Sequence, residues 1–237
     1  MKKIFIISGL LGWFTCVAQH QVPMDTVFTQ DPEVPGKQFL VIHDDDGKVM
    51  ATGSLLNGVH DGVWRQFSDF GMIFRITEYK NGARNGLNIE LGSNGMLVLD
   101  ETYENNLLNG YRTVLNNYGR TRATEYYSKG KLDGPSKKFY DDGKLQEEIF
   151  WDKGVKQGVA KWYFKNGKIS TEYTYLDGNL SGPAKVYNEE GYITSEGNYA
   201  NNEEDGEWKE YDATGNLVKK IIYKNGTVVK EIIVKKK

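Results

Sequence analysis

Histidine and cysteine, which serve in general-base, metal and thiol chemistry, are scarce in this sequence. The histidines and the single cysteine are His20, His43, His60 and Cys16. His43 occupies a position that Phe, Leu or Tyr fills at equivalent points of the chain, which indicates a packed ring rather than a catalytic base. Asp44 and Asp61 each adjoin a histidine, but neighbours along a strand point to opposite faces. We therefore predict that the protein is not an enzyme and needs no cofactor.

One acidic run could suggest calcium, because clustered oxygen ligands suit that ion. The run is Asp44-Asp45-Asp46, followed by Gly47. A calcium loop alternates its ligands over about a dozen residues, whereas this run occupies a position filled elsewhere by Tyr140-Asp141-Asp142. The run is thus typical of a turn, and we predict no metal site. No phosphate-binding loop is expected either, because turns account for nearly every glycine.

The glycines indicate which elements carry these side chains, because they recur every 24 residues. The first column, the turn glycines, is Gly47, Gly71, Gly95, Gly119, Gly143, Gly167, Gly191 and Gly215. A second column is Gly58, Gly82, Gly130, Gly154, Gly178 and Gly226, with Asn106 and Asn202 in the gaps, and a third is Gly62, Gly86, Gly110, Gly134, Gly158, Gly182 and Gly206. Glycine suits turns that need a positive φ, and Asn is its commonest substitute. We assign all three columns to turns.

The residues around each turn glycine predict how the strands pair and face. A three-residue loop closed by a left-handed glycine would place Phe67 opposite Ile73 and Tyr163 opposite Ile169. Eight residues after each turn glycine stands an aromatic row, Leu55, Tyr79, Tyr103, Tyr127, Trp151, Tyr175, Tyr199 and Tyr223. Because strand side chains alternate, this row and the residue two after each turn glycine should share one apolar face. The other face should be polar, with the exceptions Phe74, Ile76, Phe150 and Ile222.

These patterns predict an all-β fold, an elongated single-sheet β-meander of about eight 24-residue hairpin repeats with roughly sixteen strands. A helix is incompatible with a glycine about every dozen residues. At about 4.8 Å per strand the sheet would extend on the order of 75 Å. Closure into a barrel is the alternative, and small-angle scattering distinguishes the two, since a compact domain of this size has a radius of gyration near roughly 17 Å.

The two ends of the chain differ from the repeats. Residues 1–18 have a basic start, an apolar run from Ile4 to Phe14 and small residues before Gln19, which is typical of a signal peptide. The run is shorter than the about 20 residues that span a bilayer. We predict an exported protein, periplasmic or extracellular, without stable membrane insertion after cleavage; lipid modification of Cys16 is the alternative. Cleavage would leave no cysteine and therefore no disulfide.

The remaining boundaries follow from composition. Residues 19–38 contain Pro23, Pro32 and Pro35 and are predicted to form an extended lead-in. Residues 39–237 form the repeat array, whose last stretch from Thr227 leaves the pattern and ends in three lysines. Lysine discourages pairing at a sheet edge, so we expect a capping strand there.

One repeat, read from Tyr175 through Gly178, Gly182, Tyr187, Gly191 and Ile193, resembles the variant MORN repeat. The resemblance covers about Phe39 to Val234. It implies an elongated array of β-hairpins that serves as a protein interaction scaffold without a catalytic domain. It also implies an antitoxin-like or immunity-like role, because many bacterial proteins of this kind are described as the antitoxin of a toxin–antitoxin pair.

Charge and aromatic content limit the partners. The net charge of -2 and pI near 6.0 provide no basic surface for nucleic acid. The candidate binding surface is Trp64, Tyr79, Tyr103, Tyr127, Trp151, Tyr175, Tyr199 and Tyr223. These rings either form the core of the sheet or stay exposed as a ligand surface. We expect another protein as the partner; cell-envelope polysaccharide, stacked on the aromatic rings, is the alternative.

Overall fold

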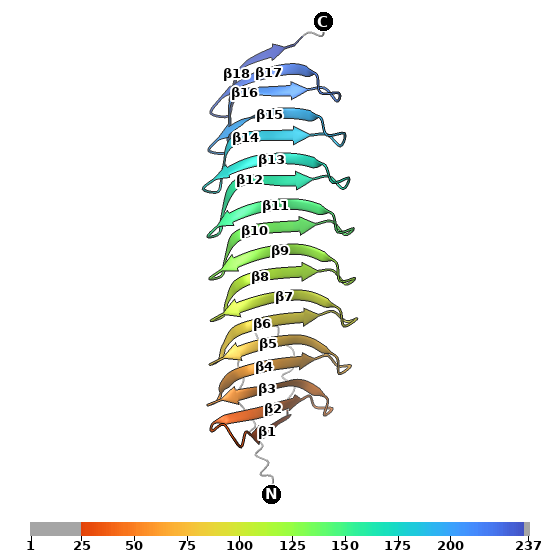
Figure 1. Cartoon of the computed structure of the whole chain (residues 1–237), viewed down its shortest axis with the longest axis vertical. Coiled ribbons are helices and arrows are strands. Elements are labelled where there is room, and N and C mark those ends of the chain that lie inside the picture. The colour runs from red at the N-terminus through yellow and green to blue at the C-terminus, as the bar shows by residue number, and fades with distance from the viewer. Residues whose placement is uncertain (1–24, 235–237) are drawn as a thin grey trace. The chain divides into compact units, whose positions relative to one another are not determined.

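The computed structural model describes residues 25–234, and this part of the chain consists of β-strands without a helix (Figure 1). The strands form an open, 18-stranded antiparallel sheet, so the barrel alternative is wrong. Sixteen of them, β2 to β17, are the eight predicted hairpins. The strands are β1 (Asp25–Gln30), β2 (Lys37–His43), β3 (Val49–Leu56), β4 (Val59–Phe67), β5 (Ile73–Lys80), β6 (Ala83–Leu91), β7 (Leu97–Glu104), β8 (Leu107–Leu115), β9 (Thr121–Ser128), β10 (Lys131–Phe139), β11 (Leu145–Asp152), β12 (Val155–Tyr163), β13 (Ile169–Leu176), β14 (Asn179–Tyr187), β15 (Ile193–Ala200), β16 (Glu203–Tyr211), β17 (Leu217–Lys224) and β18 (Thr227–Ile233).

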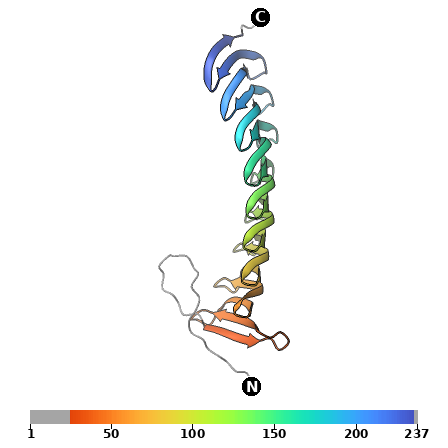
Figure 2. The same cartoon turned by 90° about the vertical axis from the view of Figure 1, so that its left-hand side faces the viewer.

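The chain divides into two units, which are described separately. Unit 1 holds the residues up to Asn109 together with Asn117–Gly119, and unit 2 holds Gly110–Asn116 and the residues from Arg120 onward. Within each unit the strands curve and the sheet twists (Figure 2). This is the normal right-handed twist of paired strands.

Turn chemistry sets the pairing of each hairpin. The predicted pairs Phe67 with Ile73 and Tyr163 with Ile169 are confirmed. Gly71 has φ +76° and donates its N–H to the Ser68 carbonyl over 2.8 Å, which closes the three-residue loop. In the first loop the Asp44 carboxylate accepts the backbone N–H groups of Asp46 and Lys48 over 3.0 and 2.8 Å. The acidic run therefore serves the turn, as predicted.

The second column forms two-residue loops in which both residues have positive φ. Asn57 and Gly58 have φ values of 52° and 84°, as a mirror-image type I turn requires. Asn106 and Asn202 take the glycine position with φ values of 67° and 70°. Asparagine tolerates this region better than other side chains, which explains the substitution.

The third column does not form turns, and that prediction is wrong. Gly62 lies inside β4, where the register passes from Ser54 opposite Asp61 to Thr52 opposite Arg65. Two extra residues in β4 make this a bulge, and Gly62 has φ +77° there. At the equivalent Gly182 a Cβ would also lie 3.2 Å from the Cβ of Thr174. Glycine is needed for both the backbone and the close approach.

A second bulge overturns the prediction that the aromatic row shares a face with the residues at the turn. The register passes from Gln66 opposite Arg75 to Phe67 opposite Ile73, leaving one extra residue. Such a bulge interrupts the alternation of side chains. Tyr163, next to the turn, donates its hydroxyl to Glu148 over 2.6 Å, whereas Trp162 donates Nε1 to the adjacent Glu147 over 2.9 Å. We call the side of the sheet that carries Trp162 and the aromatic row the aromatic face. The side that carries Tyr163 is the reverse face.

Hydrogen bonds tie successive hairpins at both ends of their strands. At the two-residue loops, Gly178 donates its N–H to the Lys156 carbonyl over 3.0 Å. At the three-residue loops, Lys168 Nζ donates to the Glu190 carbonyl over 2.7 Å. Each hairpin is thus held by its neighbour in addition to the strand ladder, which is how repeat arrays gain stability.

Two small hydrophobic clusters lie on the aromatic face. In unit 1 Leu40, Ile42, Ala51 and Trp64 are buried, and in unit 2 Ala184, Trp208 and Ile221 are buried. Each tryptophan lies flat against a glycine, Trp64 on Gly53 and Trp208 on Gly197, where a Cβ would overlap the indole. The clusters are thin because a single sheet has no second layer, so large rings must cover their own strands.

The ends of the described chain add one strand on each side of the hairpins. β1 lies within the predicted lead-in and pairs with β2, and its Phe28 packs on the cluster of unit 1. β18 pairs with β17 and is exposed along its length. The predicted signal peptide and the final three lysines lie outside the described residues. No helix in the described chain is long and apolar enough to cross a membrane.

Candidate binding surface

The structure places all eight candidate residues on the aromatic face. Trp64 is buried, and the tyrosines and Trp151 are half-buried. Seven of them, all except Trp64, stand near the ends of their strands beside the two-residue loops. The eight side chains are therefore neither a fully buried core nor a fully exposed surface.

In unit 1 the rings gather around His60. The ring centroids of His60 and Trp64 are 4.0 Å apart, and those of His60 and Tyr79 are 4.9 Å apart. Trp64 Nε1 donates to the Ser54 carbonyl over 3.0 Å. Burial lowers the pKa of His60, so the neutral imidazole is favoured. His60 is a packed ring among the aromatic side chains of this cluster.

A buried polar chain follows on the same face of unit 1. The Thr77 hydroxyl donates to Asn88 Oδ1 over 2.6 Å, Asn88 Nδ2 donates to Glu101 over 3.0 Å, and the Tyr103 hydroxyl donates to Glu101 over 2.7 Å. Burial and the Glu101 carboxylate raise the pKa of Tyr103. Sequence reasoning missed this chain, although Thr77, Asn88 and Glu101 stand where unit 2 has Ile149, Ala160 and Tyr173. Polar residues at positions that are apolar or aromatic in unit 2 were the signal in the sequence that could have revealed this chain.

In unit 2 five rings form a continuous series across the six strands β12 to β17, with none from β14. The centroid distances are 5.8 Å from Trp162 to Tyr173, 5.9 Å from Tyr173 to Tyr199, 5.2 Å from Tyr199 to Trp208 and 6.2 Å from Trp208 to Tyr223. The planes meet at 63 to 90°, so each contact is edge to face. This geometry is the favourable one for aromatic pairs. It also covers part of each ring face with a neighbour's edge.

Lys156 occupies the space between two other rings of the row. Its Nζ lies 5.7 Å from the Trp151 centroid and 4.8 Å from the Tyr175 centroid. Such cation–π contacts stabilise a lysine against an aromatic face. Trp151 Nε1 is buried and has no hydrogen-bond partner within the described residues.

The reverse face of unit 2 carries an exposed apolar stripe. The reverse-face stripe consists of the exposed Tyr111, Pro135, Phe150 and Val159 together with the half-buried Tyr126. Tyr111 pairs with Tyr126 and Pro135 with Phe150, and the first two rings lie 5.0 Å apart. Tyr111 is 63% exposed and Phe150 is 51% exposed. Sequence analysis noted Phe150 only as an exception to a polar face.

Charged pairs border the reverse-face stripe. Lys137 lies 3.9 Å from Glu148, and Lys161 lies 3.8 Å from Glu172. The repeats place these pairs one above another along the sheet. They form a polar margin beside the apolar stripe.

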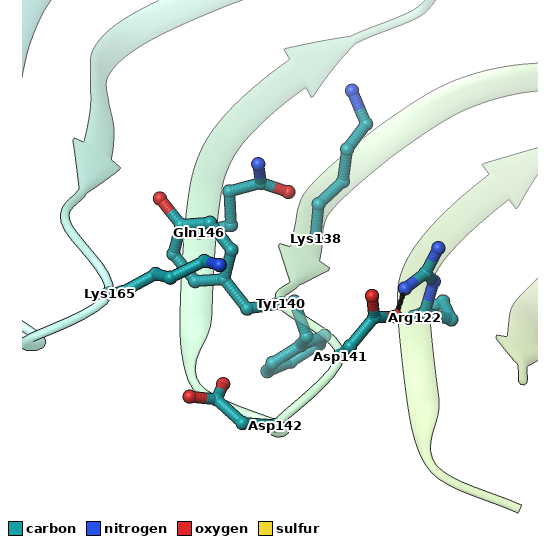
Figure 3. A pocket seen from close by; sticks show the side chains of 8 residues that line it. Arg122, Lys138, Tyr140, Asp141, Asp142, Gln146 and Lys165 are labelled. Atoms are coloured by element: carbon teal, nitrogen blue, oxygen red, sulfur yellow. Dashed lines mark ion pairs between the residues drawn. The ribbon is translucent and has the colours of Figure 1, made fainter. Parts of the chain in front are cut away.

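A hollow of about 510 Å³ lies beside a three-residue loop of unit 2, and Figure 3 shows the side chains that line it. Arg122 forms an ion pair with Asp141, Lys138 lies 2.9 Å from Glu147, and Lys165 lies 5.9 Å from the Tyr140 ring centroid. Every cation of the hollow thus has an anion or a ring beside it. The hollow therefore offers little unpaired positive charge for an anionic ligand. Within residues 25–234 no group of three or more His, Cys, Asp or Glu side chains could hold a metal ion.

Comparison with known proteins identifies the repeat. The family model for the MORN repeat variant matches residues 132–153, 156–177 and 204–225, and no curated protein matches the chain. Each match covers one hairpin from the strand after a two-residue loop to the next such loop. The other hairpins have the same register and the same two kinds of loop. Three hairpins between residues 132 and 225 are therefore MORN-variant repeats, and the other hairpins of the described chain share their architecture.

Proposed function

We propose that this chain is a non-enzymatic, exported scaffold that binds another protein through the reverse-face stripe. The observation that carries the proposal is the gathering of exposed apolar side chains on β8 to β12, where folding does not require them. Contiguous exposed apolar patches commonly mark interaction sites.

The surroundings of the stripe fit a protein partner. Protein interfaces combine an apolar centre with a polar, hydrated margin. Here Tyr111, Phe150 and Val159 supply the centre, and the Lys137–Glu148 and Lys161–Glu172 pairs supply the margin. Adjacent strands bring these side chains within about 5 Å steps of one another. A partner can therefore contact several of them at once.

The aromatic face is less suited to polysaccharide. Sugar rings stack on open aromatic faces, but the series from Trp162 to Tyr223 packs edge to face. Opening a ring would break a contact with its neighbour. Protein binding is thus favoured over sugar binding as the function of this scaffold.

Export and an immunity-like role are parts of the proposal that rest on sequence. The signal-like residues 1–18 support export, and the MORN-variant resemblance supports an immunity-like role. Mass spectrometry of the native protein tests export, with a chain beginning near Gln19 as the expected result. A chain that still begins at Met1 contradicts it.

Capture from envelope extract with the purified chain tests the binding surface. Phe150→Lys should abolish capture of the partner, because it places a charge in the apolar centre. Leu176→Lys is the matched control, since Leu176 is 54% exposed in the same unit but lies outside the stripe. Capture that survives Phe150→Lys, or polysaccharide binding that is lost in Tyr199→Ala, contradicts the proposal. Substrate turnover abolished by a point change would contradict its non-enzymatic part.

A further inference from the structure

Three successive three-residue loops of unit 1, those closed by Gly71, Gly95 and Gly119, carry large apolar side chains at their tips. Phe70 is 88% exposed, Met72 44% and Met96 41%, and Tyr118 is exposed at the next tip. We call Phe70, Met72, Met96 and Tyr118 the loop patch. The tips lie one repeat apart, so successive tips are separated by two strand spacings, or about 10 Å.

Contacts hold these tips in place relative to one another. Asn94 Nδ2 donates to the Asn117 carbonyl over 2.7 Å, which joins the second tip to the third. The Met96 methyl lies 2.7 Å from the position a Cβ on Gly119 would take. The tips that carry Met96 and Tyr118 are therefore held together, and the strand ladder between β5 and β6 places the Phe70 tip one repeat away.

Folding does not explain the choice of these side chains. The loop requires its glycine and, in several repeats, a polar cap three residues before it, but it does not require an apolar tip. The equivalent tips of unit 2 are mostly polar and include Asp142, Lys144, Asn166, Lys168, Thr214 and Asn216. The same turn thus forms with polar or with apolar tip residues. The apolar tips of unit 1 therefore indicate a role other than folding, such as binding.

The charges beside the Phe70 end of the loop patch are mainly negative. The Phe70 loop and the loop before it contain Asp44, Asp45, Asp46 and Asp69 against Lys48, whereas Arg120 lies beside Tyr118 at the other end. Asp45, Asp46 and Asp69 are exposed, and none of them forms an ion pair with another described residue. This field attracts a cationic partner and repels an anionic lipid surface.

We infer that the loop patch docks a basic amphipathic helical segment of a partner protein. The apolar side chains of that segment contact Phe70, Met72 and Met96, and its positive charges lie beside the neighbouring aspartates. Methionine adapts its shape to such helices, and acidic groups select basic ones. Residues seven apart on one face of a helix are separated by about 10 Å. That distance matches the spacing of successive tips.

The site is separate from the reverse-face stripe. It rests on the proposed scaffold function only in taking a protein as the ligand. Phe150→Lys should leave it intact, so failure of one surface is distinguishable from failure of the other.

The test uses the full chain and a synthetic leucine–lysine amphipathic helix of about 18 residues, or five turns. The dissociation constant is measured at several salt concentrations. Phe70→Ser with Met72→Ser should weaken binding about tenfold, equivalent to about 1.4 kcal/mol. Tyr192→Ser is the matched control, because Tyr192 is 49% exposed at the same loop position in unit 2 and should not affect binding. Asp45→Asn with Asp69→Asn should weaken binding and reduce its salt dependence.

Three results overturn the inference. The first is equal binding of a leucine–glutamate helix, and the second is binding of the basic helix that Phe70→Ser with Met72→Ser does not change. The third is Phe70-dependent binding to phosphatidylglycerol vesicles, or Phe70-dependent self-association, without binding of the basic helix. Phe70 and Met72 are exposed, so unchanged melting of the double variant verifies that lost binding is not lost folding.

Discussion

At the residue scale, the aromatic face depends on small residues placed under large ones. Trp64 lies on Gly53 and Trp208 on Gly197, and neither glycine has the positive φ that marks the turn glycines. Both tryptophans also donate Nε1 to a backbone carbonyl over 3.0 Å. A flat indole fixed at its nitrogen requires an uninterrupted surface below it. This explains two glycines that the 24-residue columns do not contain.

Gly197→Ala should therefore destabilise the protein for a steric reason alone. The added Cβ overlaps the Trp208 indole, and overpacking of this kind destabilises by about 1 to 3 kcal/mol. Denaturant unfolding measures the loss, and a shift in tryptophan emission should accompany it. Gly53→Ala should behave alike through Trp64. An unchanged midpoint for Gly197→Ala would show that Trp208 moves freely and that the flat packing is unimportant.

His60 should make stability depend on mild acidity. Burial lowers the pKa of His60 in the folded protein below its ordinary value of 6.5. The unfolded chain therefore binds a proton first as the pH falls, so the His60 contribution is complete above pH 6.5 and declines from there toward the folded pKa. Melting from pH 8 to 5, compared with His60→Phe, tests this. Parallel pH profiles for the two proteins would exclude the effect.

At the element scale, the sequence is informative about loops and less informative about bulges. Glycine and asparagine with positive φ identify loops of defined length, and a loop of defined length fixes the pairing of Phe67 with Ile73. The bulge beside each three-residue loop adds one residue that has no distinctive type. Side chains counted as alternating from Ile73 onward were therefore assigned to the wrong face relative to the aromatic row. The other bulge is marked by the third glycine column, but a glycine column looks the same in a sequence whether it marks a bulge or a turn. The proposed binding surfaces were harder still to predict, because the exposure of Phe150 depends on the face of its strand and nothing in the turn chemistry requires Phe70.

Trp151→Ala should separate core from binding surface. The ring is half-buried, its Nε1 is buried and Lys156 lies against it, so truncation should cost about 2 to 4 kcal/mol, somewhat below the value for a fully buried tryptophan. Partner affinity should remain unchanged, since the reverse-face stripe is on the other side of the sheet. Melting and capture are measured on the same sample. If affinity falls while stability holds, the aromatic face is the binding surface.

The tyrosines beside the turns on the reverse face should titrate late. Tyr187 donates its hydroxyl to Glu172 over 2.8 Å, and burial together with this carboxylate raises the pKa of Tyr187 to about 12. Because the unfolded tyrosine ionises near its ordinary pKa of 10.0, the stabilisation by Tyr187 is complete below pH 10 and is lost between about pH 10 and 12. Comparison of alkaline unfolding with that of Tyr187→Phe tests this. The variant should lose less stability in that interval, and ionisation of Tyr187 near pH 10 by absorbance would contradict the assignment.

At the scale of the whole molecule, stability arises from contacts between neighbouring repeats. The two hydrophobic clusters are small and lie in separate units, and hydrogen bonds at both loop ends join each hairpin mainly to the next. In such arrays stability is approximately the sum of repeat and neighbour terms. A break at an end removes one neighbour, whereas a break in the middle leaves two shorter segments.

Comparison of Gly143→Val with Gly215→Val tests this principle. The two turn glycines have φ values of 88° and 87°, where a Cβ costs about 1 to 2 kcal/mol. A Cβ on Gly143 meets nothing within 4 Å, whereas one on Gly215 lies 3.1 Å from the Tyr192 ring, so the local strain is at least as large at Gly215. Gly143→Val should nevertheless lower the unfolding midpoint more, and its transition should broaden as the flanking segments unfold separately. A larger loss for Gly215→Val would mean that local strain outweighs position, and that the repeats do not depend on their neighbours for stability.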